Sequence, residues 1–157
     1  MLTTPNVRIE TKDHDFAIGV KMNCEFRCDQ EETSFKDIWD LPAVAIECKT
    51  YLDKTMLQDA STAAEQLKTR NPNAVFLVVA EWLKLTEAVN IRKFKIDQIY
   101  VLRKQKNTDR EFRYDVDYKK NEIYPDVIEH LFETVRGFLN SAWKGGIPHG
   151  LQRGWLL

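Results

Sequence analysis

The sequence has few of the features that mark secreted, membrane-spanning or strongly basic proteins. It contains only three cysteines in 157 residues, too few for the disulfide scaffold of a small secreted domain. Its apolar runs are far shorter than the roughly 20 residues that span a bilayer, and no basic segment followed by an apolar one opens the chain. We therefore expect a cytoplasmic location, reduced cysteines and no membrane segment.

An excess of either charge is also lacking. The 23 lysines and arginines nearly balance the 24 aspartates and glutamates, which leaves a net charge of −1. Such a balance neither indicates nor excludes a nucleic-acid partner, because a neutral protein can still concentrate basic side chains on one face. Cys24 and Cys28 have the spacing of half a zinc site, but no matching pair of Cys or His follows, and buried thiols explain them better.

The length fits one compact domain, so residues 1–157 are expected to form a single domain with its core at about 7–104. Short apolar or alternating runs predict five strands, of which the first two form a hairpin. The polar, acidic residues 28–42 are expected to connect this hairpin to the third strand. The expected strands cover residues 6–10, 14–22, 43–48, 74–83 and 96–104.

Two segments have the composition and spacing of helices. One covers residues 55–69 and would cross between the strands at 43–48 and 74–83, which predicts a parallel pair. The other covers about 124–143, with Pro125 in its first turn and Gly145-Gly146 after its end. Its apolar stripe predicts packing against the core: Ile128, Leu131, Phe132, Val135, Phe138 and Leu139. The expected fold class is α/β, with a mixed central β-sheet flanked by helices.

An acid and a lysine two positions apart occur three times, but only Glu47-Cys48-Lys49 ends a strong strand. The two-residue period of a strand places Glu47 and Lys49 on one face with Ala45, and Cys48 on the other. Burying an unpaired charge is costly. The two side chains therefore either satisfy each other or belong to a site.

A second carboxylate can reach this face from the strand that begins at His14. If that strand runs antiparallel to the one ending at Lys49, its first residues lie beside the end of the other, which brings Asp15 to Glu47. Asp29 and Asp40 are rival candidates, but neither opens an apolar strand. Two carboxylates and a backbone carbonyl suit Mg²⁺, and a nearby lysine can contact a phosphate or orient water.

The segments "HDFAIG" and "VAIECKTYLDKTM" together resemble the bipartite signature of the PD-(D/E)XK nuclease superfamily. They look closest to type II restriction endonucleases of the Bpu type, which cut an asymmetric site with two different subunits. The resemblance implies a restriction-endonuclease-like core and Mg²⁺-dependent cleavage of double-stranded DNA by a homo- or hetero-oligomer with a second nuclease subunit. By position, Asp15, Glu47 and the carbonyl of Cys48 would bind the metal, and Asp15, Glu47 and Lys49 would be catalytic.

The sequence departs from the superfamily pattern before these motifs. No proline precedes Asp15, and only about six residues precede Val7, where superfamily members have a helix before the first strand. Two other functions stay open: a repair or recombination nuclease of the same fold, and a non-catalytic DNA-binding or interaction subunit in which Glu47 and Lys49 are a structural ion pair.

Other polar residues are candidates for supporting roles. Lys54 and Gln58, at the start of the first helix, are expected to contact the substrate, and Gln66 can support the site from the same helix. His14 is expected on the opposite strand face, away from catalysis. Further basic residues suit either phosphate contact or a solvated surface: Lys68, Arg92, Lys93, Lys95, Arg103, Lys104 and Lys106.

Overall fold

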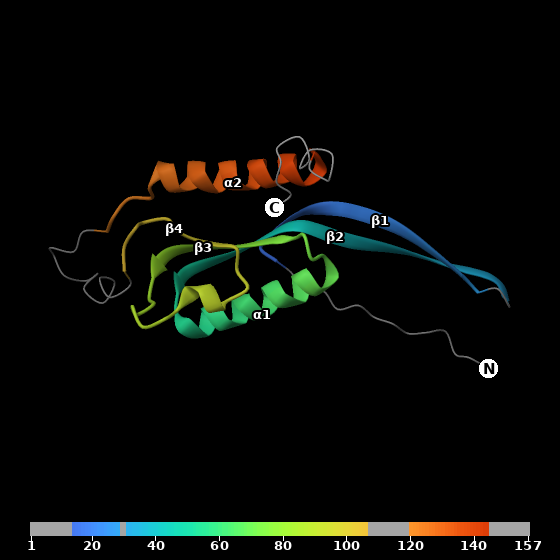
Figure 1. Cartoon of the computed structure of the whole chain (residues 1–157), viewed down its shortest axis with the longest axis horizontal. Helices are drawn as coiled ribbons and strands as arrows, with labels where there is room; N and C mark the ends of the chain where they lie inside the picture. Colours follow the sequence, from blue (N-terminus) through green and yellow to red (C-terminus); the bar gives the residue numbers. More distant parts are fainter. Residues whose placement is uncertain (1–13, 29–30, 107–119, 145–157) are drawn as a thin grey trace, which may run out of the picture.

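The computed structural model describes residues 14–28, 31–106 and 120–144. Within these ranges the chain forms a four-stranded sheet in the order β1-β2-β3-β4, with β1 antiparallel to β2 and the other neighbours parallel. One long helix covers each face of the sheet (Figure 1). This architecture confirms the predicted α/β class and mixed sheet.

The elements follow one another without a repeat. They are β1 (Phe16–Cys28), β2 (Glu31–Leu52), α1 (Lys54–Arg70), β3 (Val75–Leu83), the short 3-10 helix η1 (Ile91–Lys93), β4 (Gln98–Val101) and α2 (Pro125–Lys144). The predicted first strand, at residues 6–10, lies outside the described residues. The parallel pairing of β2 with β3, which Val44 opens opposite Val75, confirms the predicted strand–helix–strand unit.

The prediction for residues 28–42 was wrong. Instead of a polar connection, residues 31–42 form the first half of β2 and pair with β1 along almost its whole length. The missed signal is an alternation in which Phe35, Trp39 and Leu41 share one face. The alternation is concealed because Asp37 interrupts the apolar face and Ile38 lies on the otherwise polar one. The two strands therefore project beyond β3 as a long arm, seen at the right of Figure 1.

A bulge lies where the arm joins the sheet. Ile18 pairs with Val44, whereas the next residue, Gly19, pairs with Pro42, so Ala43 is the extra residue. A β-carbon on Gly19 would lie 2.3 Å from the Leu41 carbonyl oxygen, which explains the glycine. Proline has no amide hydrogen for a regular ladder, so its place at a bulge is expected.

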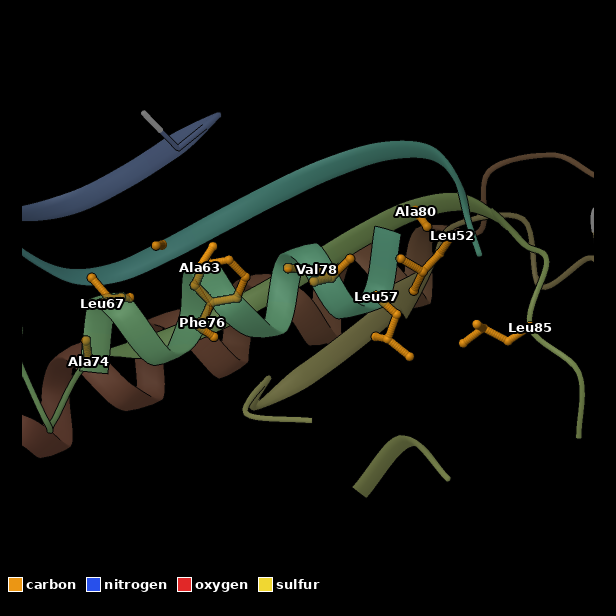
Figure 2. Packing of buried hydrophobic residues seen from close by; sticks show 12 residues of the cluster. Leu52, Leu57, Ala63, Leu67, Ala74, Phe76, Val78, Ala80 and Leu85 are labelled. Atoms are coloured by element: carbon orange, nitrogen blue, oxygen red, sulfur yellow. The ribbon is translucent and has the colours of Figure 1, made fainter. Parts of the chain in front are cut away.

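The core on one sheet face is built around α1. Asp53 caps this helix by accepting a hydrogen bond from the Met56 amide at 2.9 Å. The buried side of α1 is rich in alanine, and these small side chains let the helix lie close to β2 and β3 (Figure 2). The cluster includes Leu52, Leu57, Ala60, Ala63, Ala64, Leu67, Phe76, Val78 and Ala80.

Helix α2 covers the other face. Leu131, Val135, Phe138 and Leu139 pack against a cluster of Val44, Leu77, Val79 and Tyr100, as the stripe predicted. Two members of the predicted stripe do not: Ile128 is 47% exposed and Phe132 is 61% exposed. Val127 packs in their place, because the helix lies rotated toward the edge of the stripe. Within the described residues, neither helix is long and apolar enough to cross a membrane.

Candidate active site

The start of β1 lies beside the end of β2. Phe16 pairs with Ile46, so the preceding residue, Asp15, lies opposite Glu47 on the next rung. This is the antiparallel arrangement that the sequence predicted. The rival Asp40 pairs with Lys21, six residues after Asp15 along β1, and Asp29 falls outside the described residues. The register therefore brings Asp15 to the Glu-x-Lys segment and leaves Asp40 remote from it.

Asp15 is tied to the backbone of the neighbouring strand. Its Oδ2 accepts a hydrogen bond from the Cys48 amide at 2.6 Å. In a strand, the N–H and C=O of one residue point to the same side, so the Cys48 carbonyl also faces the side on which Asp15 lies. Because β1 begins only at Phe16, no further strand residue bonds to the Cys48 amide. The Asp15 carboxylate accepts that hydrogen bond instead.

Glu47 and Lys49 form an ion pair on the face covered by α1. The Lys49 Nζ lies 2.6 Å from Glu47 Oε1, and the glutamate side chain is only 7% exposed, against 28% for the lysine. The predicted faces are confirmed, since Ala45 packs against α1 and Ile46 packs on the opposite side. A carboxylate this deeply buried needs a positive partner, and Lys49 supplies it here.

The pKa of the Cys48 thiol is affected by the charged groups of the site. Cys48 is exposed by surface area, yet partial burial of the thiol raises its pKa, and the nearby Asp15 carboxylate raises it further. The Lys49 ammonium lowers the pKa of the same thiol, and Glu47 raises it. All three charged groups therefore act on one point, and two negative charges against one positive charge favour the arrival of a cation.

The donor set fits a hard divalent cation that keeps several waters. Asp15 and Glu47 offer carboxylate oxygens from opposite positions on neighbouring strands, and the Cys48 carbonyl faces the same edge. In the described part of the chain, no group of three or more His, Cys, Asp or Glu side chains is placed to hold a metal. Asp15 and Glu47 supply the one or two carboxylates with which proteins bind Mg²⁺.

His14 does not lie where the sequence predicted. The prediction placed it on the face opposite Glu47, but its ring stacks edge-on against Phe76, with 5.6 Å between ring centroids. Phe76 belongs to the cluster under α1, the side on which Glu47 lies. Because His14 precedes the first residue of β1, it is not bound by the alternation of a strand.

The predicted substrate contacts have different surroundings. Lys54 and Gln58 lie one turn apart and exposed at the start of α1, and Gln66 is exposed further along that helix. Several of the other basic residues are engaged in ion pairs: Lys68 with Asp97, Arg103 with Glu81, Lys104 with Asp126 and Lys106 with Glu87. Arg103 has the most internal contacts of these residues: besides its ion pair, it donates a hydrogen bond to the Asn121 carbonyl, and its side chain is largely buried.

Comparisons with known proteins identify the family and the fold. The family model described as Bpu10I restriction endonuclease matches residues 1–156. Among solved structures, the chain is similar to one described as the native BbvCI A2B2 tetramer at low resolution, with 28% sequence identity and a TM-score of 0.65. The match covers 87% of this chain and 49% of that one, so this chain spans about half the length of that relative. No curated protein matches the sequence.

Proposed function

Because the chain belongs to the Bpu10I restriction endonuclease family, we propose that it is a Mg²⁺-dependent endonuclease of the PD-(D/E)XK type. It would hydrolyse phosphodiester bonds of double-stranded DNA, as a type II restriction endonuclease or as the catalytic domain of one. The observation that carries this proposal is the meeting of Asp15, Glu47 and Lys49 where the start of β1 adjoins the end of β2.

The two carboxylates and the Cys48 carbonyl would hold the metal. When bound, Mg²⁺ supplies Lewis-acid stabilisation of charge on the phosphate and lowers the pKa of a bound water. The hydrogen bond from the Cys48 amide fixes the Asp15 carboxylate in place. Burial under α1 fixes Glu47, so little reorganisation is needed when the cation binds.

Lys49 would act on the substrate rather than on the metal, since an ammonium group cannot coordinate a cation. It lies on the same face as Glu47 and is partly open to solvent, which leaves it access to a phosphate oxygen. There it would stabilise the negative charge that develops in the transition state or orient the attacking water. Removing one such donor typically lowers the rate by about 10²–10³-fold.

Two residues of α1 would contact the DNA backbone. Lys54 lies in the first turn of the helix and Gln58 lies one turn later, both exposed. A lysine that neutralises a phosphate releases counterions and contributes affinity without reading sequence. Lys54 therefore serves positioning, and target recognition has to come from other residues.

We also propose that the chain acts with a second nuclease subunit, identical or different. The BbvCI structure is described as an A2B2 tetramer, and this chain carries a single Glu-x-Lys constellation of the proposed kind in its described residues. Cutting both strands of a duplex with one site in each chain needs a pair of chains. One chain alone would therefore nick.

Plasmid relaxation tests the proposed activity. We expect purified protein with Mg²⁺ to convert supercoiled plasmid into open-circular and linear forms, and EDTA to abolish this conversion. Lys49→Ala should slow it by about 10²-fold or more. Identical background conversion by wild type and Lys49→Ala would contradict the proposal and favour a non-catalytic subunit.

Lys68→Ala is the matched control. Lys68 is 27% exposed, nearly as Lys49 is, and is paired at 2.8 Å to Asp97, a carboxylate that is more exposed than Glu47. Replacing Lys68 removes a lysine–carboxylate ion pair from another part of the molecule. Activity should stay near that of wild type, and an equal loss in both variants would attribute the effect to stability.

A further inference from the structure

The arm formed by β1 and β2 has two unlike faces. Apolar residues such as Phe26 and Phe35 gather on one of them, which continues the sheet surface under α2. Polar residues gather on the other. We call it the polar arm face; it comprises Lys21, Asn23, Glu25 and Arg27 of β1, with Ser34, Lys36, Ile38 and Asp40 of β2. Each of these eight residues is exposed, so the face is open to a polar partner.

The polar arm face continues the side of the sheet that carries the candidate active site. Ala17 pairs with Ala45, which packs against α1 on the same side as Glu47. The alternation of β1 carries this side on to Lys21, because the extra residue of the bulge lies in β2. Between the site and Lys21, this side of β1 presents Ala17 and Gly19, both small and exposed. A duplex bound at the site can therefore reach the arm without crossing a bulky side chain of β1.

Helix α1 ends where the arm begins. Its C-cap, Asn71, donates a side-chain hydrogen bond to the Pro42 carbonyl at 2.9 Å. The outer part of the arm extends past the ends of both helices (Figure 1). Neighbouring strands lie about 4.8 Å apart, and the major groove of B-DNA, about 12 Å wide, admits a two-stranded ribbon. The outer arm therefore has the width that this groove accepts.

The polar groups of this face suit base edges better than phosphates. Phosphates attract cations alone, whereas base edges in the major groove present both donors and acceptors. Lys21 and Lys36 make no ion pair with the described residues, while Arg27 is paired with Glu25 at 3.3 Å. Acids, an amide and a hydroxyl alternate with these cations along the two strands. Such a mixture matches a pattern of bases.

Ile38 is an apolar residue in the middle of this polar face. It is 64% exposed and pairs with Asn23 on the neighbouring strand. Side chains directly opposite each other lie about 4.5–5.5 Å apart at their β-carbons. In the major groove, an asparagine can form two hydrogen bonds with adenine, and an apolar side chain contacts the methyl group of thymine. An exposed isoleucine beside an asparagine therefore matches an A·T pair.

We propose that the polar arm face enters the major groove of double-stranded DNA and reads base edges, with Asn23 and Ile38 placed on an A·T pair. The inference rests on the endonuclease function proposed above and gives that enzyme its recognition element. At the spacing of a strand, Asn23 lies about 25 Å from Asp15, which is less than the roughly 34–36 Å of one DNA turn. The bases that it reads should lie on one side of the scissile phosphate, within one turn.

Selection from a randomised duplex library tests the proposal by binding alone. The full chain is incubated with the library and Ca²⁺, a hard cation that takes oxygen ligands as Mg²⁺ does, and the retained duplexes are sequenced. Wild type should enrich a motif that contains an A·T pair. Asn23→Ala should lower the discrimination at that pair by about 5–150-fold, the range of one good base contact. Ile38→Ser should relax the same position by a smaller factor.

Met22→Ala is the matched control. Met22 precedes Asn23 on β1 and is 43% exposed, but it lies on the apolar face. This variant should select the same motif as wild type, and circular dichroism should show that all three variants stay folded. Dimethyl sulfate supplies a second readout, since it methylates guanine N7, an acceptor in the major groove. Bound wild type should protect guanines next to the A·T pair.

Three results would overturn the proposal. They are a wild type that enriches no motif, a motif that Asn23→Ala and Ile38→Ser leave unchanged, and an equal change caused by Met22→Ala. Plasmid cleavage is measured separately. Normal cleavage with a motif that ignores the arm variants refutes the reading surface alone, whereas a motif that responds to them without any cleavage refutes the nuclease activity alone.

Discussion

At the scale of single residues, Lys49 has two roles that experiments can separate. It neutralises a glutamate that is almost fully buried, and in the proposed reaction it contacts the phosphate. A cation bound to Glu47 would replace the first of these interactions and release the ammonium for the second. The ion pair with Lys49 neutralises Glu47, and a cation at the site would take over this role.

Lys49→Ala should consequently destabilise the protein in the absence of metal. Breaking a buried ion pair costs about 3–5 kcal/mol, and the partial exposure of Lys49 places the expected loss near 3 kcal/mol or below. Mg²⁺ should then raise the melting temperature of Lys49→Ala by more than it raises that of wild type, because the cation meets Glu47 without competition. Differential scanning fluorimetry at graded Mg²⁺ concentrations measures this.

Lys68→Ala again provides the control. It should lose a more exposed ion pair, with a smaller loss of stability, and respond to Mg²⁺ as wild type does. If Mg²⁺ stabilises Lys49→Ala no more than Lys68→Ala, Glu47 is not a ligand of the cation.

The site residues differ in how far the sequence predicted them. Glu47 and Lys49 are local in sequence, and a strand's alternation is enough to place them on one face. Placing Asp15 needed a long-range pairing, which the apolar run after it made predictable. The position of His14 was not predictable, because a residue just outside a strand has no fixed alternation, and its contact with Phe76 joins segments far apart in the chain.

At the scale of elements, the bulge at Gly19 controls which face of the arm is apolar. One extra residue in β2 keeps the apolar residues of both strands on the same side across the junction. Without the bulge, the outer half of β2 would turn its apolar side chains to the other face.

Gly19→Ala should therefore destabilise the protein by about 1–3 kcal/mol, the usual cost of forcing a carbon into filled space. The new β-carbon would lie 2.3 Å from the Leu41 carbonyl oxygen and 2.7 Å from the Pro42 α-carbon. The backbone at these two residues would therefore have to move. Chemical denaturation gives the free energy of unfolding.

Gly137→Ala is the matched substitution in α2. No atom lies within 4 Å of a β-carbon there, and alanine is favoured over glycine in a helix interior by about 0.5–1 kcal/mol. This variant should gain stability. A neutral Gly19→Ala would mean that the arm joins the sheet without the close approach at the bulge.

The elements predicted best were α1 and β3, whose apolar patterns lie on either side of the turn residues between them. β3 and α1 agree with prediction to within one residue at each end. The first half of β2 was missed because its alternation is imperfect: Asp37 lies on the apolar face and Ile38 on the polar one. The exposed Ile128 and Phe132 of α2 show a related limit, since an apolar stripe does not fix the rotation of a helix on its sheet.

At the scale of the whole molecule, the site lies at the junction of two structural parts. On one side is the sheet with its two helices, and on the other is the arm (Figure 1). Asp15 stands where β1 begins and Glu47 stands within the covered part of β2, so the antiparallel pairing that forms the arm also assembles the site. Folding of the arm and formation of the site are thus coupled.

The charge balance of the molecule also bears on its substrate. With a net charge of −1 and several basic side chains paired to acids, the free chain has little general attraction for DNA. Binding should rest on few phosphate contacts, Lys54 among them, and on the proposed cation at the two carboxylates.

The most direct test of the central claim is a titration with Mn²⁺, followed by electron paramagnetic resonance, since this ion reports binding without any cleavage. Wild type should show a saturable site. Asp15→Asn, which keeps an oxygen acceptor for the Cys48 amide, should lose it while remaining folded. The absence of a saturable site in wild type, or an unchanged one in Asp15→Asn, would contradict the assignment of Asp15 and Glu47 as a metal centre.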